Sequence, residues 1–207
     1  MKKLLIITGP QGSGNHMWSK IFALHPDVFG WQELLDNYWV GHDQEPFAPY
    51  WKQPALLNEF DWSKSNYYVA SVSVPYMDNG TVTIPNFKEF IAELNKLNIV
   101  VQIAVLGRDQ NVLRMQQGRV REQVSLDTAL VEFSKLVDIS YLSFELLHLY
   151  RAKYLDQLSR TLDFPIGHGD LRVETILADD TNNKYFTQHI TQYWVDDLAK
   201  QSSRKRI

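Results

Sequence analysis

Short apolar runs alternate along the chain with amphipathic stretches. Unbroken apolar or β-branched segments at 4–7, 67–74 and 99–106 predict strands, because a parallel strand buried on both faces has no polar side. Apolar residues at helical spacing predict helices over 17–24 and 86–97. This alternation predicts an α/β fold, a three-layer sandwich with a mainly parallel central sheet.

The second half of the chain gives longer and less sharply bounded segments. Residues 126–162 predict one long helical region, or two helices with a break, and residues 163–166 predict a short strand. A last helix is expected over 184–200, and the basic tail at about 202–207 is expected to be disordered. No internal repeat or linker is visible, so residues 1–207 are predicted to form a single domain.

The segment from 27 to 66 is irregular and rich in aromatic residues and proline. A long irregular segment inside a compact domain is often a binding loop or a lid. The aromatic rings fit either a ligand-binding wall or ordinary core packing, and the pattern alone does not separate the two.

Composition excludes several classes of function. The 207 residues carry a formal net charge of −3, which argues against a general nucleic-acid-binding protein but permits a local site for a small anion. Without cysteine there is no disulfide, thiolate metal site or cysteine nucleophile, which is typical of a reducing compartment and leads us to expect a cytoplasmic protein. The apolar run at 4–7 is too short for a signal peptide or a membrane span, so we expect no membrane partner. The histidines lack metal-ligand spacing, and no metal site is predicted.

The most informative motif is the glycine-rich stretch Gly9-Pro10-Gln11-Gly12-Ser13-Gly14. It follows a predicted strand and precedes a predicted helix, which is the context of a phosphate-binding loop. Nucleoside-triphosphatase loops continue with lysine and then serine or threonine, whereas this chain has Asn15 and His16. It therefore lacks the usual cation for the β- and γ-phosphates and the usual magnesium ligand. The loop is suited to a phosphate that is held rather than transferred.

Together with two later segments, this loop resembles the PAPS-dependent sulfotransferases, where PAPS is 3′-phosphoadenosine-5′-phosphosulfate. The first likeness is the loop, its helix and the ending Phe-Ala-Leu-His-Pro-Asp-Val at 22–28. The others are the strand that ends in Arg-Asp at 100–109 and the Gly-Asp-Leu at 169–171. The resemblance implies a P-loop NTPase-like fold, PAPS as co-substrate and its bisphosphate, PAP, as product. It also implies transfer of a sulfuryl group to a hydroxyl or amine of a small molecule or glycan.

The same resemblance assigns two groups of binding residues. Arg108 and Gln116 correspond to the site for the 3′-phosphate, although an ion pair of Arg108 with Asp109 on the surface is an alternative. The loop lacks the family's lysine, whose position is taken by glycine, and asparagine and histidine replace its threonines. The residues implied to hold the 5′-phosphosulfate are Gly12, Ser13, Gly14, Asn15 and His16.

Two residues are candidates for the catalytic base. Glu33 is preferred, because it follows the His-Pro-Asp-Val turn at about the distance of a catalytic glutamate in heparan-type members of the family. An exposed glutamate at a helix start is the alternative. His16 is the second candidate, either as a base or as a protonated replacement for the lysine, with a structural role as the alternative. The acceptor is expected beneath the aromatic residues between Trp31 and Trp62, and the oligomeric state is left open.

Two other functions remain open from the sequence. A degenerate P-loop nucleoside or nucleotide kinase fits residues 4–14, although Asn15 argues against it. A non-catalytic relic that keeps the nucleotide site is consistent with Gly12 at the position of the lysine.

Overall fold

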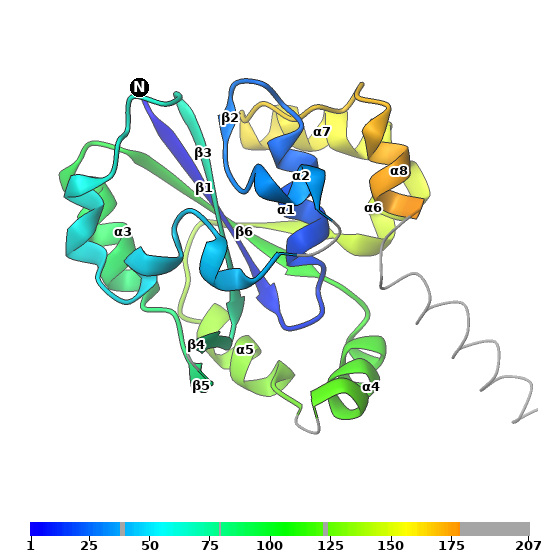
Figure 1. Cartoon of the computed structure of the whole chain (residues 1–207). Helices are drawn as coiled ribbons and strands as arrows, with labels where there is room; N and C mark the ends of the chain where they lie inside the picture. Colours follow the sequence, from blue (N-terminus) through cyan, green and yellow to red (C-terminus); the bar gives the residue numbers. More distant parts are fainter. Residues whose placement is uncertain (38–39, 79, 122–123, 179–207) are drawn as a thin grey trace, which may run out of the picture.

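The protein is built around a five-stranded parallel sheet (Figure 1). The structure, a computed structural model, describes residues 1–37, 40–78, 80–121 and 124–178. The strand order is β2-β3-β1-β6-β7, with β1 at the centre. The strands are β1 (Lys3–Pro10), β2 (Val28–Phe29), β3 (Tyr67–Val74), β6 (Val100–Gly107) and β7 (Ile139–Ser143). A small antiparallel pair, β4 (Tyr76–Asp78) with β5 (Thr81–Thr83), lies apart from this sheet. The predicted α/β fold with a mainly parallel sheet is confirmed.

Helices cover both faces of the sheet (Figure 1). One face carries α1 (Asn15–Ala23), α6 (Phe144–Tyr150), α7 (Ala152–Leu162) and α8 (Arg172–Ala178). The other face carries α3 (Phe87–Lys96) and α5 (Leu126–Phe133). The short α2 (Glu33–Asp36) packs near α1, and α4 (Gln110–Arg121) follows β6. Among the described residues, no helix has the length and apolar character needed to cross a membrane.

The central strand explains why the apolar runs are continuous. Leu5 and Ile7 pack in the cluster that contains α1, while Leu4 and Ile6 pack in the cluster that contains α3. All four side chains are fully buried. Because successive side chains point to opposite faces, a strand with a hydrophobic layer on each side needs an apolar residue at every position.

The elements predicted in the first half are confirmed, within two residues except for β1, which runs three residues beyond the predicted end at residue 7. The helix expected over 86–97 is α3, and Asn86 caps it by accepting a hydrogen bond from the Glu89 amide at 3.2 Å. The helix expected over 17–24 is α1, which begins two residues earlier. The strands expected over 67–74 and 99–106 are β3 and β6.

The helical prediction for 126–162, as one region or as two helices with a break, is wrong because the segment contains a strand. It consists of α5, the strand β7, and the helices α6 and α7. β7 pairs with β6 in parallel register, Ala104 opposite Ser140 and Leu106 opposite Leu142. Pairing with the edge of a sheet is a tertiary contact, and it overrides the helical spacing of the surrounding apolar residues.

The short strand predicted over 163–166 is also wrong. Phe164 and Ile166 are buried against the α1 face of the sheet, but this segment joins no strand. Its apolar residues pack as an extended connection after α7, where the Ser159 hydroxyl donates to the Phe164 carbonyl at 2.7 Å. The helix expected over 184–200 and the tail at 202–207 lie outside the described residues.

The irregular segment from 27 to 66 forms β2, α2 and three short 3₁₀ helices, His42–Gln44, Ala48–Trp51 and Pro54–Glu59. Its rings pack against one another and against the sheet. Trp51 stacks on Phe90 of α3 with ring centroids 3.9 Å apart, and Phe47 lies 4.9 Å from Phe60. We call the group Phe47, Tyr50, Trp51, Phe60, Trp62 and Tyr68 the aromatic layer.

Candidate functional site

The carboxyl ends of β1 and β6 define the place where a ligand is expected to bind. After β1 the chain turns to α1 on one face, and after β6 it passes through α4 to α5 on the opposite face (Figure 1). The connections diverge between two neighbouring strands, which opens a crevice at the switch point of an open α/β sheet. The glycine loop, residues 9–14, and Arg108 both follow these strands directly.

The glycine loop has the backbone geometry of an anion cradle. Gly12 and Gly14 adopt φ angles of 92° and 101°, which glycine reaches without the strain that a side chain imposes. The Ser13 amide donates to the Pro10 carbonyl at 3.0 Å, which closes the turn. The first hydrogen bond of α1 runs from the Trp18 amide to the Gly14 carbonyl at 2.9 Å. The preceding amides at the start of α1 therefore have no acceptor within the helix and carry its partial positive charge.

Three side chains from the segment β6–α4 form a hydrogen-bond network with the glycine loop. Arg108 Nη1 donates to the Gly12 carbonyl at 2.7 Å and to Gln116 Oε1 at 2.8 Å. Gln117 Nε2 donates to the Gln11 carbonyl at 2.7 Å. Because these donors satisfy two loop carbonyls, the loop presents mainly backbone amides to an anion. We call Arg108, Gln116 and Gln117 the clamp.

The structure brings Arg108 and Gln116 to the glycine loop itself. Arg108 is only 6% exposed, and its guanidinium lies 4.6 Å from the centre of the Phe144 ring. This burial is incompatible with the alternative of a surface ion pair. Asp109 instead begins α4, where its carboxylate accepts a hydrogen bond from the Val112 amide at 2.9 Å.

Gln117 is a residue that the sequence did not single out. Its side chain is fully buried and joins the glycine loop to the Ser125 amide, which donates to Gln117 Oε1 at 2.9 Å. A glutamine in a polar helix has no pattern that marks it as buried, so only the tertiary arrangement reveals it.

Ser13 and Asn15, two of the predicted binding residues, use their side chains within the protein. Asn15 Nδ2 donates to the Val72 carbonyl at 3.2 Å and lies 3.5 Å from the Ser71 hydroxyl. Ser13 Oγ donates to Asn15 Oδ1 at 3.2 Å. Both residues are buried, so they tie the start of α1 to β3. Because the Ser13 amide bonds to the Pro10 carbonyl, a contribution to a bound anion would come from the Asn15 backbone amide.

His16 lies on the first turn of α1 and contacts the segment from Trp31 to His42. Its Nε2 is 2.9 Å from the Val40 carbonyl, and its ring packs 4.9 Å from Trp31 and 4.5 Å from His42. Burial is the main cause that lowers the pKa of His16 below its usual value. These surroundings favour the neutral imidazole, with Nε2 donating to Val40 and the lone pair on Nδ1. They disfavour a protonated replacement for the lysine.

Glu33 is the exposed first residue of α2. Asn37 Nδ2 donates to its backbone carbonyl at 2.8 Å. The structure thus leaves Glu33 on the surface of α2, outside the network that joins the glycine loop, the clamp and Asn15. Its catalytic role stays a prediction.

A second residue that the sequence did not single out is Glu45, a carboxyl group buried beside β3. It accepts hydrogen bonds from the Phe47 amide at 2.8 Å and the Ser71 amide at 3.0 Å. Burial raises the pKa of Glu45 to about 8, against its usual value near 4.5. Ser71 also contacts Asn15, so Glu45 supports the strand on which the start of α1 rests. A glutamate in an irregular loop gives no sequence signal of burial.

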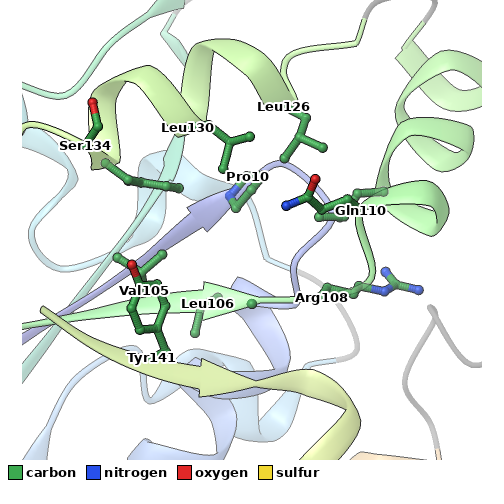
Figure 2. A pocket seen from close by; sticks show the side chains of 12 residues that line it. Pro10, Val105, Leu106, Arg108, Gln110, Leu126, Leu130, Ser134 and Tyr141 are labelled. Atoms are coloured by element: carbon green, nitrogen blue, oxygen red, sulfur yellow. The ribbon is translucent and has the colours of Figure 1, made fainter.

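A pocket of about 300 Å³ opens beside the glycine loop (Figure 2). On one side are side chains of α5, and on the other are the ends of β6 and β7. Pro10, Arg108 and Gln110 connect this pocket to the glycine loop and to α4. Other residues that line the pocket and set its polarity are Val105, Leu126, Leu130, Phe133, Ser134 and Tyr141.

Among the residues that the structure describes, no three histidine, aspartate or glutamate side chains gather as a metal site would require. Comparisons with protein-family models, with the curated proteins and with solved structures found no match for this chain. The function is therefore argued from the geometry of the site.

Proposed function

We propose that this protein is a PAPS-dependent sulfotransferase of P-loop NTPase-like fold, which moves a sulfuryl group to a hydroxyl or amine. The observation that carries the proposal is the 2.7 Å hydrogen bond from Arg108 to the Gly12 carbonyl. It places a guanidinium against a glycine loop that lacks a lysine of its own. An anion in the loop then meets backbone amides, a helix N-terminus and a permanent cation together.

Arg108 compensates for the main departure of this loop from the family pattern. A cation next to the bridging oxygen stabilises the negative charge that builds up on the departing phosphate. Arg108 reaches the loop from the end of β6, and Gln116 orients its guanidinium at 2.8 Å.

Residues after the loop favour sulfuryl transfer over transfer of a phosphoryl group from ATP. Asn15 stands where a kinase has its phosphate-binding lysine, and its side-chain amide binds β3. His16 stands where a hydroxyl would bind magnesium, and its imidazole packs against Trp31 and His42. Neither side chain supplies what a magnesium nucleotide needs.

In the proposed reaction the acceptor oxygen attacks sulfur in line with the leaving phosphate. A bond forms between that oxygen and sulfur, and the bond between sulfur and the bridging oxygen breaks. The electron pair and negative charge leave with PAP. The acceptor's hydroxyl proton passes to a base, for which Nδ1 of the neutral His16 and the Glu33 carboxylate are the two candidates.

Binding measurements on the arginine test the nucleotide assignment. Wild-type protein is expected to bind PAP more tightly than Mg-ATP in calorimetry. Arg108→Gln should weaken PAP binding at least about tenfold, and Arg108→Lys less, because lysine keeps the charge without the planar fork. Arg114→Gln is the matched control, since Arg114 lies on α4 and pairs with Asp127 at 2.5 Å in solvent. Tighter binding of Mg-ATP than of PAP would overturn the proposal.

Turnover separates an enzyme from a protein that only binds the nucleotide. We expect release of PAP from PAPS in the presence of an acceptor, with Glu33→Gln or His16→Ala lowering kcat at least about tenfold. PAP binding without turnover on any acceptor would instead identify a non-catalytic relic. Full rates in both variants would show that neither residue is the base.

A further inference from the structure

The pocket beneath α5 has no assigned occupant. We propose that it binds the acceptor, and that the acceptor is a small, uncharged, largely apolar alcohol or phenol rather than a glycan. This inference rests on the proposed function for the role of the occupant. The pocket itself and its chemistry are independent of that function.

The position of Arg108 separates the nucleotide from the pocket. Its guanidinium points away from the other labelled pocket side chains (Figure 2) and bonds to Gly12 and Gln116. It also lies over Phe144, on the α1 face of the sheet. A nucleotide held by the clamp therefore lies on the α1 side of the switch point. The pocket, on the α5 side, is left for the second substrate.

The pocket is nevertheless next to the glycine loop. Pro10 is the last residue of β1, forms part of the pocket wall, and accepts the hydrogen bond that closes the loop. A ligand beneath α5 can thus direct a hydroxyl past Pro10 toward the anion. In-line attack requires this hydroxyl to reach sulfur opposite the bridging oxygen of the phosphosulfate.

The lining chemistry selects the class of acceptor. Leu126 and Leu130 of α5 face Val105 and Tyr141 of the sheet across the pocket (Figure 2), and Phe133 also belongs to the apolar lining. The polar side chains of the lining are Ser134, Tyr141, Gln110 and Arg108. The Gln110 amide faces Pro10 and Leu126, whereas the Arg108 guanidinium points away from them (Figure 2). A sugar ring carries several hydroxyls, each of which needs a partner when buried, and apolar walls do not supply them. An apolar ring with one hydroxyl matches these walls.

Size and exposure support the same occupant. A volume of about 300 Å³ lies at the small end of ligand pockets and suits one or two rings. Leu130 is 42% exposed and Tyr141 is 68% exposed, so apolar surface at the pocket mouth remains in contact with water. Covering this surface with an apolar ligand is favourable.

Leu130→Glu tests the pocket, because it places a charge at the mouth without changing the clamp. Leu149→Glu is the matched control, an exposed leucine on α6 on the opposite face of the sheet. The probes are 2-naphthol, N-acetylglucosamine and PAP, each measured by calorimetry. Naphthol binding is measured both with and without saturating PAP. Unfolding curves without ligand verify that both variants are folded.

We expect wild-type protein and Leu149→Glu to bind 2-naphthol more tightly than N-acetylglucosamine. Leu130→Glu should lose at least about tenfold in naphthol affinity and keep its PAP affinity within twofold. Equal naphthol affinity in wild type and Leu130→Glu would overturn the proposal, as would preference for the sugar or no naphthol binding. An equal loss of PAP affinity would assign the pocket to the nucleotide and overturn it too.

The same experiment distinguishes failure of the proposed function. If wild-type protein does not bind PAP but Leu130→Glu still lowers the affinity for 2-naphthol, the sulfotransferase proposal fails. The pocket is then a site for an apolar alcohol in a different reaction. If wild-type protein binds PAP and Leu130→Glu leaves the affinity for 2-naphthol unchanged, the nucleotide site is retained. The assignment of the pocket to the acceptor is then wrong.

Discussion

The glycine loop and the aromatic layer differ in how their sequence relates to their role. The glycine loop is short, backbone-based and held by polar contacts from the clamp. The aromatic layer is long and side-chain-based, and its rings contact one another and the sheet. The sequence left the aromatic residues open between a ligand-binding wall and core packing, and the structure shows that Phe47 and Trp51 are core residues.

This difference follows from what each kind of side chain can do alone. A positive φ at glycine is a local property, so Gly12 and Gly14 create a cradle wherever a strand precedes and a helix follows. A large apolar ring is drawn to whatever apolar surface is available, and here that surface is β3 and α3. Rings such as Phe47 and Trp51 therefore stabilise the fold and are not available as a wall for the acceptor.

The largest expected effect is on stability, from a substitution in the aromatic layer. Phe47 is fully buried, so Phe47→Ala should lower the free energy of unfolding by about 3–5 kcal/mol. Where it remains folded, its PAP affinity should stay within twofold of wild type. Chemical denaturation and calorimetry measure the two quantities. The control Tyr150→Ala removes an exposed ring and should change stability by less than about 0.5 kcal/mol. A specific loss of PAP binding in Phe47→Ala would break the comparison.

The next effect is on binding, from the glycine loop. Gly12→Ala places a Cβ 3.2 Å from Gln116 Oε1 at a φ of 92°, so it strains the backbone and disturbs the clamp. PAP affinity should fall by roughly tenfold to a hundredfold, about 1.4–2.7 kcal/mol. Gly80→Ala is the matched control, because Gly80 also has a positive φ but no neighbour within 4 Å of the added Cβ. Equal PAP affinity in both variants would remove the glycine loop from the site.

The smallest effect, measured per pH unit, is a dependence of stability on pH that joins the two regions at Glu45. Its pKa is about 8 in the folded protein and near 4.5 when exposed, so the native state binds more protons between these values. Stability should therefore fall as pH rises from about 4.5 to 8, by at most about 1.4 kcal/mol per pH unit, and level off above.

Urea unfolding of wild type, Glu45→Gln and Glu59→Gln across this range measures the slope. Glu45→Gln should lose the part of the pH slope that comes from Glu45, even if the substitution also changes the stability at every pH. Glu59→Gln alters an exposed carboxylate and should keep the wild-type slope. A wild-type slope retained in Glu45→Gln would show that Glu45 is not the responsible group.

Much of the fold could be predicted because its signals are local. The continuous apolar runs of β1 and β3 and the amphipathic spacing of α3 follow directly from burial. β7 could not be predicted, since its residues pair with the free edge of β6 and otherwise continue a helical pattern. α4 was also missed, because its polar residues show little apolar periodicity.

The candidate site divides in the same way. Gly12 and Gly14 were identified from the position of their loop after a strand, and Arg108 from the family resemblance. The structure brings Arg108 to Gly12. Gln117 and Glu45 became visible only through burial and hydrogen bonds, because the sequence does not encode burial of a single polar residue. The direction of the Arg108 side chain, which separates clamp from pocket, is likewise a tertiary property.

Backbone and indole N–H signals, followed by NMR while PAP is added, test the central claim most directly. The account predicts that PAP shifts the amide signals of Gly12, Gly14 and His16 and the guanidinium signal of Arg108. The indole signals of Trp51 and Trp62, both in the aromatic layer, should stay in place. Shifts of these indole signals with the loop amides unchanged would contradict the assignment of the glycine loop as the anion site.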